Sequence, residues 1–201
     1  ANVVLRDHIY KMESVLYTTS ITKTGYFFVR FSGLFLAVFA LLVCTVLGIY
    51  IGTFFVDGAE LGNVSIINYL YPLLIFGLPN VLFPCSLIFC TAVLTKNVRA
   101  IYVAGVLLYI LYMAASILGN SPLLANSVKV SNPSILPFII DPFGLASFFS
   151  ETRNWTNLQR NKQLFPLGST FLINRLLWLG CSVLVIAISY RFFNFRVQSQ
   201  S

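Results

Sequence analysis

Charged residues are scarce in this sequence: they make up 9% of 201 residues, whereas soluble domains contain about a quarter. Apolar residues account for 58%, and the mean hydropathy is +0.84. This composition argues against a water-soluble fold. The net charge of +7 does not indicate nucleic-acid binding, because the 13 basic residues are scattered between apolar blocks and form no patch.

Catalytic and cofactor-binding groups are also missing. The single histidine, His8, allows neither a His-based metal cluster nor a Ser-His-Asp triad within the chain. The sequence has no G-x-x-x-x-G-K-[ST] phosphate loop, and no apolar run carries a central Asp, Glu or Lys that would relay protons. The cysteines, Cys44, Cys85, Cys90 and Cys181, lie in apolar runs without metal-ligand spacing. We therefore expect no enzyme activity, cofactor or metal, and any active transport would need energy from another protein.

Long apolar runs predict an all-α fold, a polytopic membrane helical bundle that forms one domain over residues 1–201. A hydrocarbon core about 30 Å thick requires about 20 helical residues for each crossing. Four runs meet this requirement, at about residues 31–55, 71–94, 100–118 and 171–190. The second run contains Pro72, Pro79 and Pro84, so we expect this span to be kinked.

The distribution of basic residues sets the expected orientation. Lys and Arg precede the first span, join the second to the third, and follow the fourth, which places these segments in the cytoplasm. The loop after the first span has no Lys or Arg and carries Asp57 and Glu60. The loop at residues 120–170 does contain basic residues, but it approaches the length beyond which the rule fails. We expect both ends of the chain to be cytoplasmic.

In the segment before the first span, residues 1–25, the first part has the pattern of an amphipathic helix, and the polar residues 17–25 break this pattern. Leu5, Ile9, Met12 and Leu16 recur at helical spacing, and charged residues fill the other side. One interpretation is a helix that lies passively on the lipid surface. The other is a cytoplasmic docking helix that offers its charged face to a partner.

The outer loop, residues 120–170, is too apolar to be a solvated linker, so it must pack on something. Asp141 followed by Pro142 predicts a helix start, with a short helix at residues 143–150. Two interpretations are equally open for this loop. It is either a lid that stabilises the bundle or an element that handles substrate.

One charge falls inside a predicted span. Arg175 is the fifth residue of the fourth run, from which its side chain can extend to the outer interface. We favour this interpretation over a buried functional charge, which would cost about 2.5–3.5 kcal/mol at the bilayer centre. Gly48 and Gly52 form one small-xxx-small spacing in the first span, which is a weak indication of helix packing.

Several stretches of the sequence resemble the permease subunits of ATP-binding-cassette exporters of the type-two class. The resemblance covers nearly the whole chain and is to a bacterial branch whose permease can be fused to a zinc aminopeptidase domain. It rests on the stretch from Arg6-Asp7-His8 through Met12-Glu13 to Tyr17, on residues 25–30, on Asp141-Pro142-Phe143-Gly144, on Thr152-Arg153-Asn154-Trp155-Thr156 and on Asn174-Arg175-Leu176-Leu177-Trp178.

The resemblance implies the membrane part of an ATP-driven exporter in the cell inner membrane, coupled to a separate ATPase subunit. Residues 1–25 would dock on that ATPase, and the following candidate residues are implied. They are Arg6, Asp7, Glu13 and Tyr17 for docking, Asp141, Pro142, Phe143, Gly144 and Trp155 in the outer loop, and Asn174 and Arg175 in the last span. Family members have six spans and act as dimers, so we expect two further spans upstream and a homodimer or pseudo-dimer.

The alternative is a membrane scaffold or assembly protein that anchors other components and transports nothing. A docking helix and a required ATPase partner separate the exporter from the scaffold. The sequence does not indicate which substrate an exporter would carry, because exporters of this class handle lipids, polysaccharides, drugs and peptides with spans of similar composition.

Overall fold

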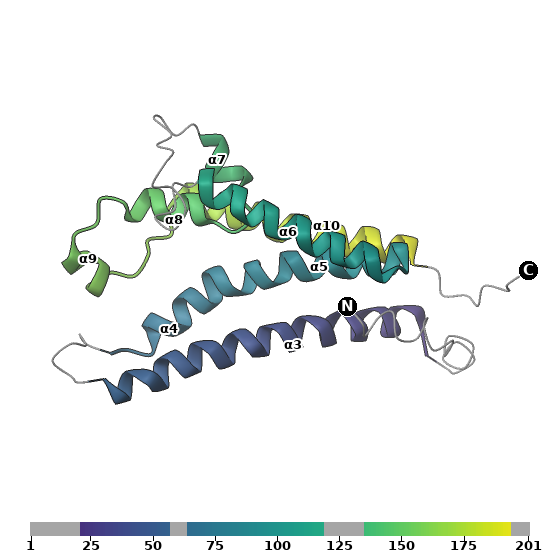
Figure 1. Cartoon of the computed structure of the whole chain (residues 1–201), viewed down its shortest axis with the longest axis horizontal. Coiled ribbons are helices and arrows are strands. Elements are labelled where there is room, and N and C mark those ends of the chain that lie inside the picture. Colours follow the sequence, from purple (N-terminus) through teal and green to yellow (C-terminus); the bar gives the residue numbers. More distant parts are fainter. Residues whose placement is uncertain (1–20, 57–63, 119–134, 194–201) are drawn as a thin grey trace, which may run out of the picture.

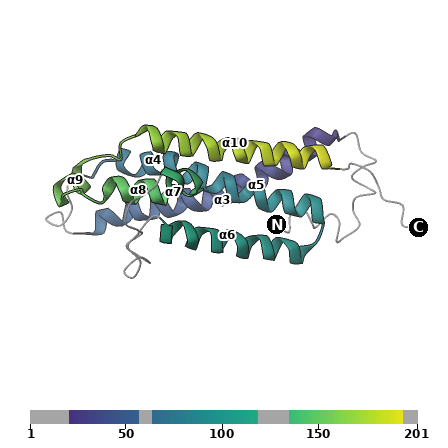
Figure 2. The same cartoon turned by 90° about the horizontal axis from the view of Figure 1, so that it is seen from above.

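The computed structural model describes residues 21–56, 64–118 and 135–193, and these residues are all helix, turn or irregular chain. Four helices are long and apolar enough to cross a membrane, which confirms the predicted fold class. They run side by side along the long axis of the molecule (Figures 1 and 2). The expected docking segment, with Arg6, Asp7, Glu13 and Tyr17, lies outside the described residues.

Each predicted span corresponds to one of these long helices. The first comprises α3, Lys23–Gly52, and a short 3-10 turn, η1, at Thr53–Phe55. The third is α6, Val98–Leu118, and the fourth is α10, Ser169–Phe192. The helices begin up to eight residues earlier than the apolar runs, because caps and polar first turns extend them. Thr22, for example, accepts a hydrogen bond from the backbone N–H of Gly25 at the start of α3.

The second span is irregular, as its prolines predict. It begins with α4, Ile67–Pro72, passes through a π-helical turn, η2, at Leu73–Gly77, and continues as α5, Leu78–Thr95. The π turn follows Pro72 directly, at the point where the pyrrolidine ring removes a helical hydrogen bond. The span therefore accommodates Pro72 with one wider, π-helical turn and continues as a helix on both sides of it.

Helix α5 lies at the centre of the bundle and packs against α3, α6 and α10. Figure 2 shows α6 and α10 on opposite sides of it. The main apolar cluster joins α3 and α5 through Phe27, Phe31, Cys85, Phe89 and Val93, with Ile186 and Tyr190 of α10 packed against it. The Phe27 ring makes edge contacts with the rings of Phe89 and Tyr190, at centroid distances of 5.0 and 5.3 Å. These ring contacts join the first half of α3 to α5 and to α10.

Farther along, Gly77 provides a close approach between α3 and the second span. A Cβ atom at Gly77 would lie 2.8 Å from Leu42 Cδ2 and 3.3 Å from Leu73 Cδ1. A Cβ atom at Gly48 or Gly52 would meet nothing within 4 Å. Gly77, in the π turn, is therefore the small residue used for packing, and the Gly48/Gly52 spacing has no such use among the described residues.

Replacement of Gly77 by valine should push α3 away from the second span. We expect the free energy of unfolding to fall by about 1–3 kcal/mol, the usual cost of inserting methyl groups into a packed contact. The measurement is unfolding of the purified protein in detergent, and Gly48→Val is the matched control because its Cβ meets open space. Equal losses of stability in the two variants would contradict the assigned contact.

Between α6 and α10, the described residues 135–168 contain three short helices, at one end of the bundle (Figure 1). They are α7, Ile135–Ile140, α8, Leu145–Thr152, and α9, Asn157–Lys162. Short helices were predicted in this loop, but the one expected at residues 143–150 begins later, at Leu145. Gly144, with a φ of +73°, precedes it as the N-cap. The Asp-Pro pair forms a turn before the helix instead of its first residues.

Candidate functional site

Four polar side chains meet where α5, α10 and the α7–α8 turn come together. They are Asn80 of α5, Asp141 of the turn, and Asn174 and Arg175 of α10, and we call them the polar cluster. Asp141, Asn174 and Arg175 are buried, whereas Asn80 is half-buried. Polar groups inside a membrane bundle are costly unless they bind one another, so their hydrogen bonds determine what the site can do.

Arg175 points into the protein, so the expectation that it extends to the interface is wrong. Its side chain is 4% exposed. Nη1 donates to Asn80 Oδ1 at 2.9 Å, while Nε and Nη2 donate to Asn174 Oδ1 at 3.0 and 2.8 Å. The guanidinium donates to acceptors on α5 and on its own helix, α10, and does not extend to the membrane interface.

Aromatic rings and one carboxylate complete the surroundings of Arg175. Its Cζ atom lies 5.3 Å from the ring centroid of Phe171 and 6.0 Å from that of Phe76. The Asp141 carboxylate is near enough for its charge to interact with the guanidinium, although the described residues form no direct ion pair with Arg175. The charge is thus held by amides, ring faces and a nearby opposite charge.

Asn174 binds the end of α7. Its side chain is fully buried, and Nδ2 donates to the carbonyl oxygens of Phe138, Ile139 and Asp141 at 2.7, 3.1 and 2.8 Å. Trp178 Nε1 also donates to the Ile139 carbonyl, at 3.0 Å. The last carbonyls of a helix have no partner within it, so two side chains of α10 supply the missing donors.

Asp141 organises the turn that leads into α8. Its Oδ1 accepts from the backbone N–H of Phe143 at 2.8 Å, and its Oδ2 accepts from that of Ala146 at 2.7 Å. The carboxylate therefore caps the first turn of α8 from a position three residues before Gly144, the N-cap. On the other side of the turn, Asn80 Nδ2 donates to the Phe143 carbonyl at 3.1 Å.

Gly144 allows the turn to approach Arg175. Its φ of +73° lies in the left-handed region, which side chains with a Cβ atom disfavour. A Cβ atom there would also overlap the guanidinium of Arg175. Glycine is therefore required at this position for two independent reasons.

The structure brings most of the predicted loop and last-span candidates together. Asp141, Pro142, Phe143 and Gly144 form the turn that packs against Asn174 and Arg175. Trp155 lies apart, half-buried between α8 and α9. Sequence reasoning missed Asn80, although an asparagine within a long apolar run is a recognisable signal for a polar contact at membrane depth.

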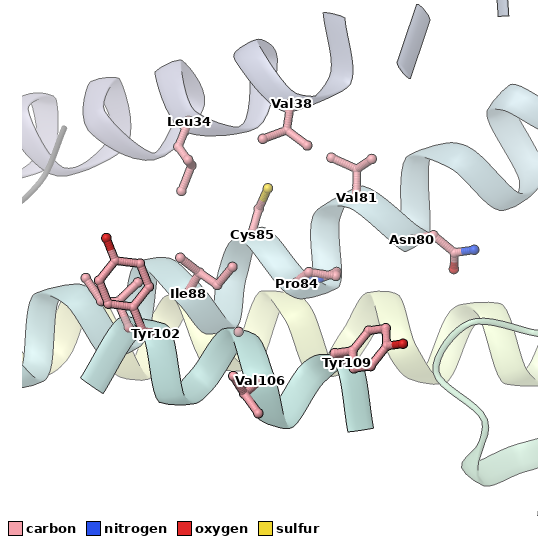
Figure 3. A pocket seen from close by; sticks show the side chains of 12 residues that line it. Leu34, Val38, Asn80, Val81, Pro84, Cys85, Ile88, Tyr102, Val106 and Tyr109 are labelled. Atoms are coloured by element: carbon pink, nitrogen blue, oxygen red, sulfur yellow. The ribbon is translucent and has the colours of Figure 1, made fainter. Parts of the chain in front are cut away.

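Two apolar grooves meet at Asn80. The first, of about 650 Å³, lies between α3, α5 and α6 (Figure 3). The second, of about 580 Å³, lies between α3 and the irregular part of the second span. Asn80 lines both grooves while it binds Arg175. The polar cluster therefore borders both of these grooves.

These features define a multi-pass membrane protein with a buried polar cluster beside grooves at the depth of its spans. Comparisons with protein families, with curated proteins and with solved structures find no match for this chain.

Proposed function

We propose that this protein is the membrane-spanning permease of an ATP-driven exporter, which works with a separate ATPase subunit and a second permease unit in the bacterial inner membrane. The observation that carries the proposal is the polar cluster beside two grooves within the spans. Ionisable groups at this depth are costly and mark substrate pathways in many membrane proteins, which favours a transporter over a passive anchor.

The positions of the family-like stretches support the same proposal. Asp141-Pro142-Phe143-Gly144 and Asn174-Arg175 resemble separate parts of such permeases, and here they pack into one cluster. With the expected orientation, the α7–α8 turn enters the bundle from the outer side of the membrane. Its attachment to α5 and α10 supports a role on the path by which an exported molecule would leave the bundle.

The packing of α3 connects the expected cytoplasmic docking segment to the helices that carry the polar cluster. Residues 1–25 would dock on the ATPase, and α3 begins within the last residues of this segment, at Lys23. Phe27 of α3 contacts Phe89 of α5 and Tyr190 of α10, and these two helices carry Asn80 and Arg175 farther along. A shift of the docking segment would therefore reach both helices that hold the polar cluster.

The test is purification of the full-length protein from its native membrane in mild detergent. We expect a P-loop ATPase to co-purify, and Glu13→Arg to lower its recovery about tenfold, which corresponds to about 1.4 kcal/mol of binding free energy. Charge reversal on the docking face removes a favourable contact and adds a repulsive one. Recovery is quantified by mass spectrometry of the purified complex.

Glu151→Arg is the matched control, because Glu151 is an exposed glutamate on α8, at the opposite end of the bundle from the start of α3. It should leave ATPase recovery unchanged. A protein that purifies without any nucleotide-binding partner would refute the exporter and favour a membrane scaffold.

A further inference from the structure

The walls of the groove between α3, α5 and α6 are almost entirely apolar. Its apolar side chains include Leu34, Val38, Val81, Ile88, Ile101 and Val106. Val106 and Tyr109 of α6 line the groove and are 59% and 61% exposed, so in a membrane the groove opens towards lipid. The volume of about 650 Å³ falls within the range of about 300–1,000 Å³ that is typical of small-molecule sites.

One end of this groove carries an amide beside a tyrosine hydroxyl. Asn80 and Tyr109 lie at this end, near the middle of their spans (Figure 3). The Tyr109 hydroxyl makes no hydrogen bond with the described residues. Asn80 uses one Nδ2 hydrogen on Phe143 and one Oδ1 lone pair on Arg175, which leaves one donor and one acceptor site unused.

Pro84 removes one backbone hydrogen-bond donor from α5 next to Asn80. It lines the groove one helical turn after Asn80 on α5, and it has no N–H to donate to the Asn80 carbonyl. This carbonyl therefore lacks its usual helical partner. Hydrocarbon supplies no hydrogen bonds, so a plain alkyl chain in the groove would leave all these groups unsatisfied.

The unused groups define the chemistry of a suitable occupant. They comprise donors and acceptors together, so the occupant must be able to accept and to donate, as hydroxyl and amide groups do. Arg175 lies behind Asn80, but the nearby Asp141 carries the opposite charge, so the site does not favour a charged group. The rest of the groove suits a hydrocarbon chain.

We propose that this groove binds a neutral single-chain amphiphile, with its hydroxyl or amide group between Asn80 and Tyr109 and its alkyl chain along Ile88 and Val106. Under the exporter function proposed above, on which this role rests, such a molecule is the transported substrate. It enters the groove from the bilayer, past the exposed face of α6.

The test is photolabelling of the full-length protein in phosphatidylcholine vesicles. The probe is a monoacylglycerol that carries a diazirine in its acyl chain, and the matched probe is the methyl ester of the same diazirine fatty acid, which has no hydroxyl group. We expect the monoacylglycerol to label groove residues such as Ile88 and Val106 about fivefold more than the ester, as one or two hydrogen bonds would produce. Unlabelled monoacylglycerol should compete.

Tyr109→Phe should lower the labelling by the monoacylglycerol probe about fivefold, towards that of the ester, because it removes only the hydroxyl. Tyr102→Phe is the matched control: Tyr102 lines the same groove at the end away from Asn80. It should leave the labelling unchanged. Equal labelling by the two probes, or full labelling of Tyr109→Phe, would show that bulk lipid fills the groove and would overturn the proposal.

The photolabelling result can be separated from the ATPase recovery that tests the proposed function. Recovery of an ATPase together with equal labelling overturns the groove site and leaves the exporter. Selective labelling without an ATPase supports the site for an amphiphile and overturns its role in export.

Discussion

Replacement of Asn174 by leucine should lower the free energy of unfolding by about 3 kcal/mol. Leucine has a similar size, so the loss comes from hydrogen bonding. The carbonyl oxygens of Phe138 and Asp141 lose their side-chain donor, and two nitrogens of the Arg175 guanidinium lose their acceptor. A buried charge without its partners is the costly part, because the interior offers no replacement.

The expected loss in the free energy of unfolding distinguishes a connected cluster of hydrogen bonds from a single hydrogen bond. An isolated side-chain hydrogen bond between membrane helices contributes about 0.6 kcal/mol on average. The two Nδ2 hydrogens of Asn174 are shared among three carbonyl oxygens, and Oδ1 accepts from two nitrogens of Arg175, so the side chain connects α7 to Arg175. A loss near 3 kcal/mol would show that these bonds act together, and a loss near 0.6 kcal/mol would contradict the cluster.

The measurement is reversible unfolding in mixed detergent micelles, followed by circular dichroism. Asn157→Leu is the matched control, because Asn157 is exposed in the first turn of α9 and should change the stability little. Asn174→Asp separates the two roles of the side chain. It keeps an acceptor for Arg175 and removes the donor to the α7 carbonyls, so its effect should be intermediate.

Gly144→Ala is expected to have the second largest effect, a loss of about 2–3 kcal/mol. The left-handed conformation costs an alanine about 1–2 kcal/mol relative to glycine, and displacement of the guanidinium adds to this. The same unfolding measurement applies. The matched control is Gly168→Ala, because Gly168 has a φ of −61° and open space around its Cβ position.

A double-mutant cycle tests the cause of the Gly144→Ala effect. If the new methyl group acts by displacing Arg175, then Gly144→Ala should cost less in an Arg175→Met background, where the guanidinium is already absent. The remaining cost should equal the backbone term alone. Additive losses would show that the two residues act independently, against the overlap seen in the structure.

The four spans could be predicted because they depend on local properties of the chain. Run length and apolar content set the number of crossings, and Pro72 marks the irregular turn in the second span. The direction of the Arg175 side chain could not be predicted in this way, because it depends on Asn80, 95 residues earlier. The start of α8 likewise depends on Asp141 capping the helix from a distance.

The candidate site was predictable in part. The stretches around Asp141 and Asn174 stand out in the sequence, but nothing local shows that one binds the other. Asn80 became part of the site only when the packing of α5 against α10 was known. Trp155 stands out by the same criterion as the loop residues and lies elsewhere, which shows that a distinctive stretch does not define a contact.

The partners of Arg175 also bear on how the protein is made. Translocation of α10 alone would place a guanidinium in hydrocarbon, at a cost of about 2.5–3.5 kcal/mol at the helix centre. Synthesis proceeds from the N-terminus, so Asn80 and the α7–α8 turn leave the ribosome before α10 does. The acceptor on Asn174 travels with the arginine itself. The order of the chain thus allows the guanidinium to form its hydrogen bonds as the last described span is inserted, without any later rearrangement of the helices already in place.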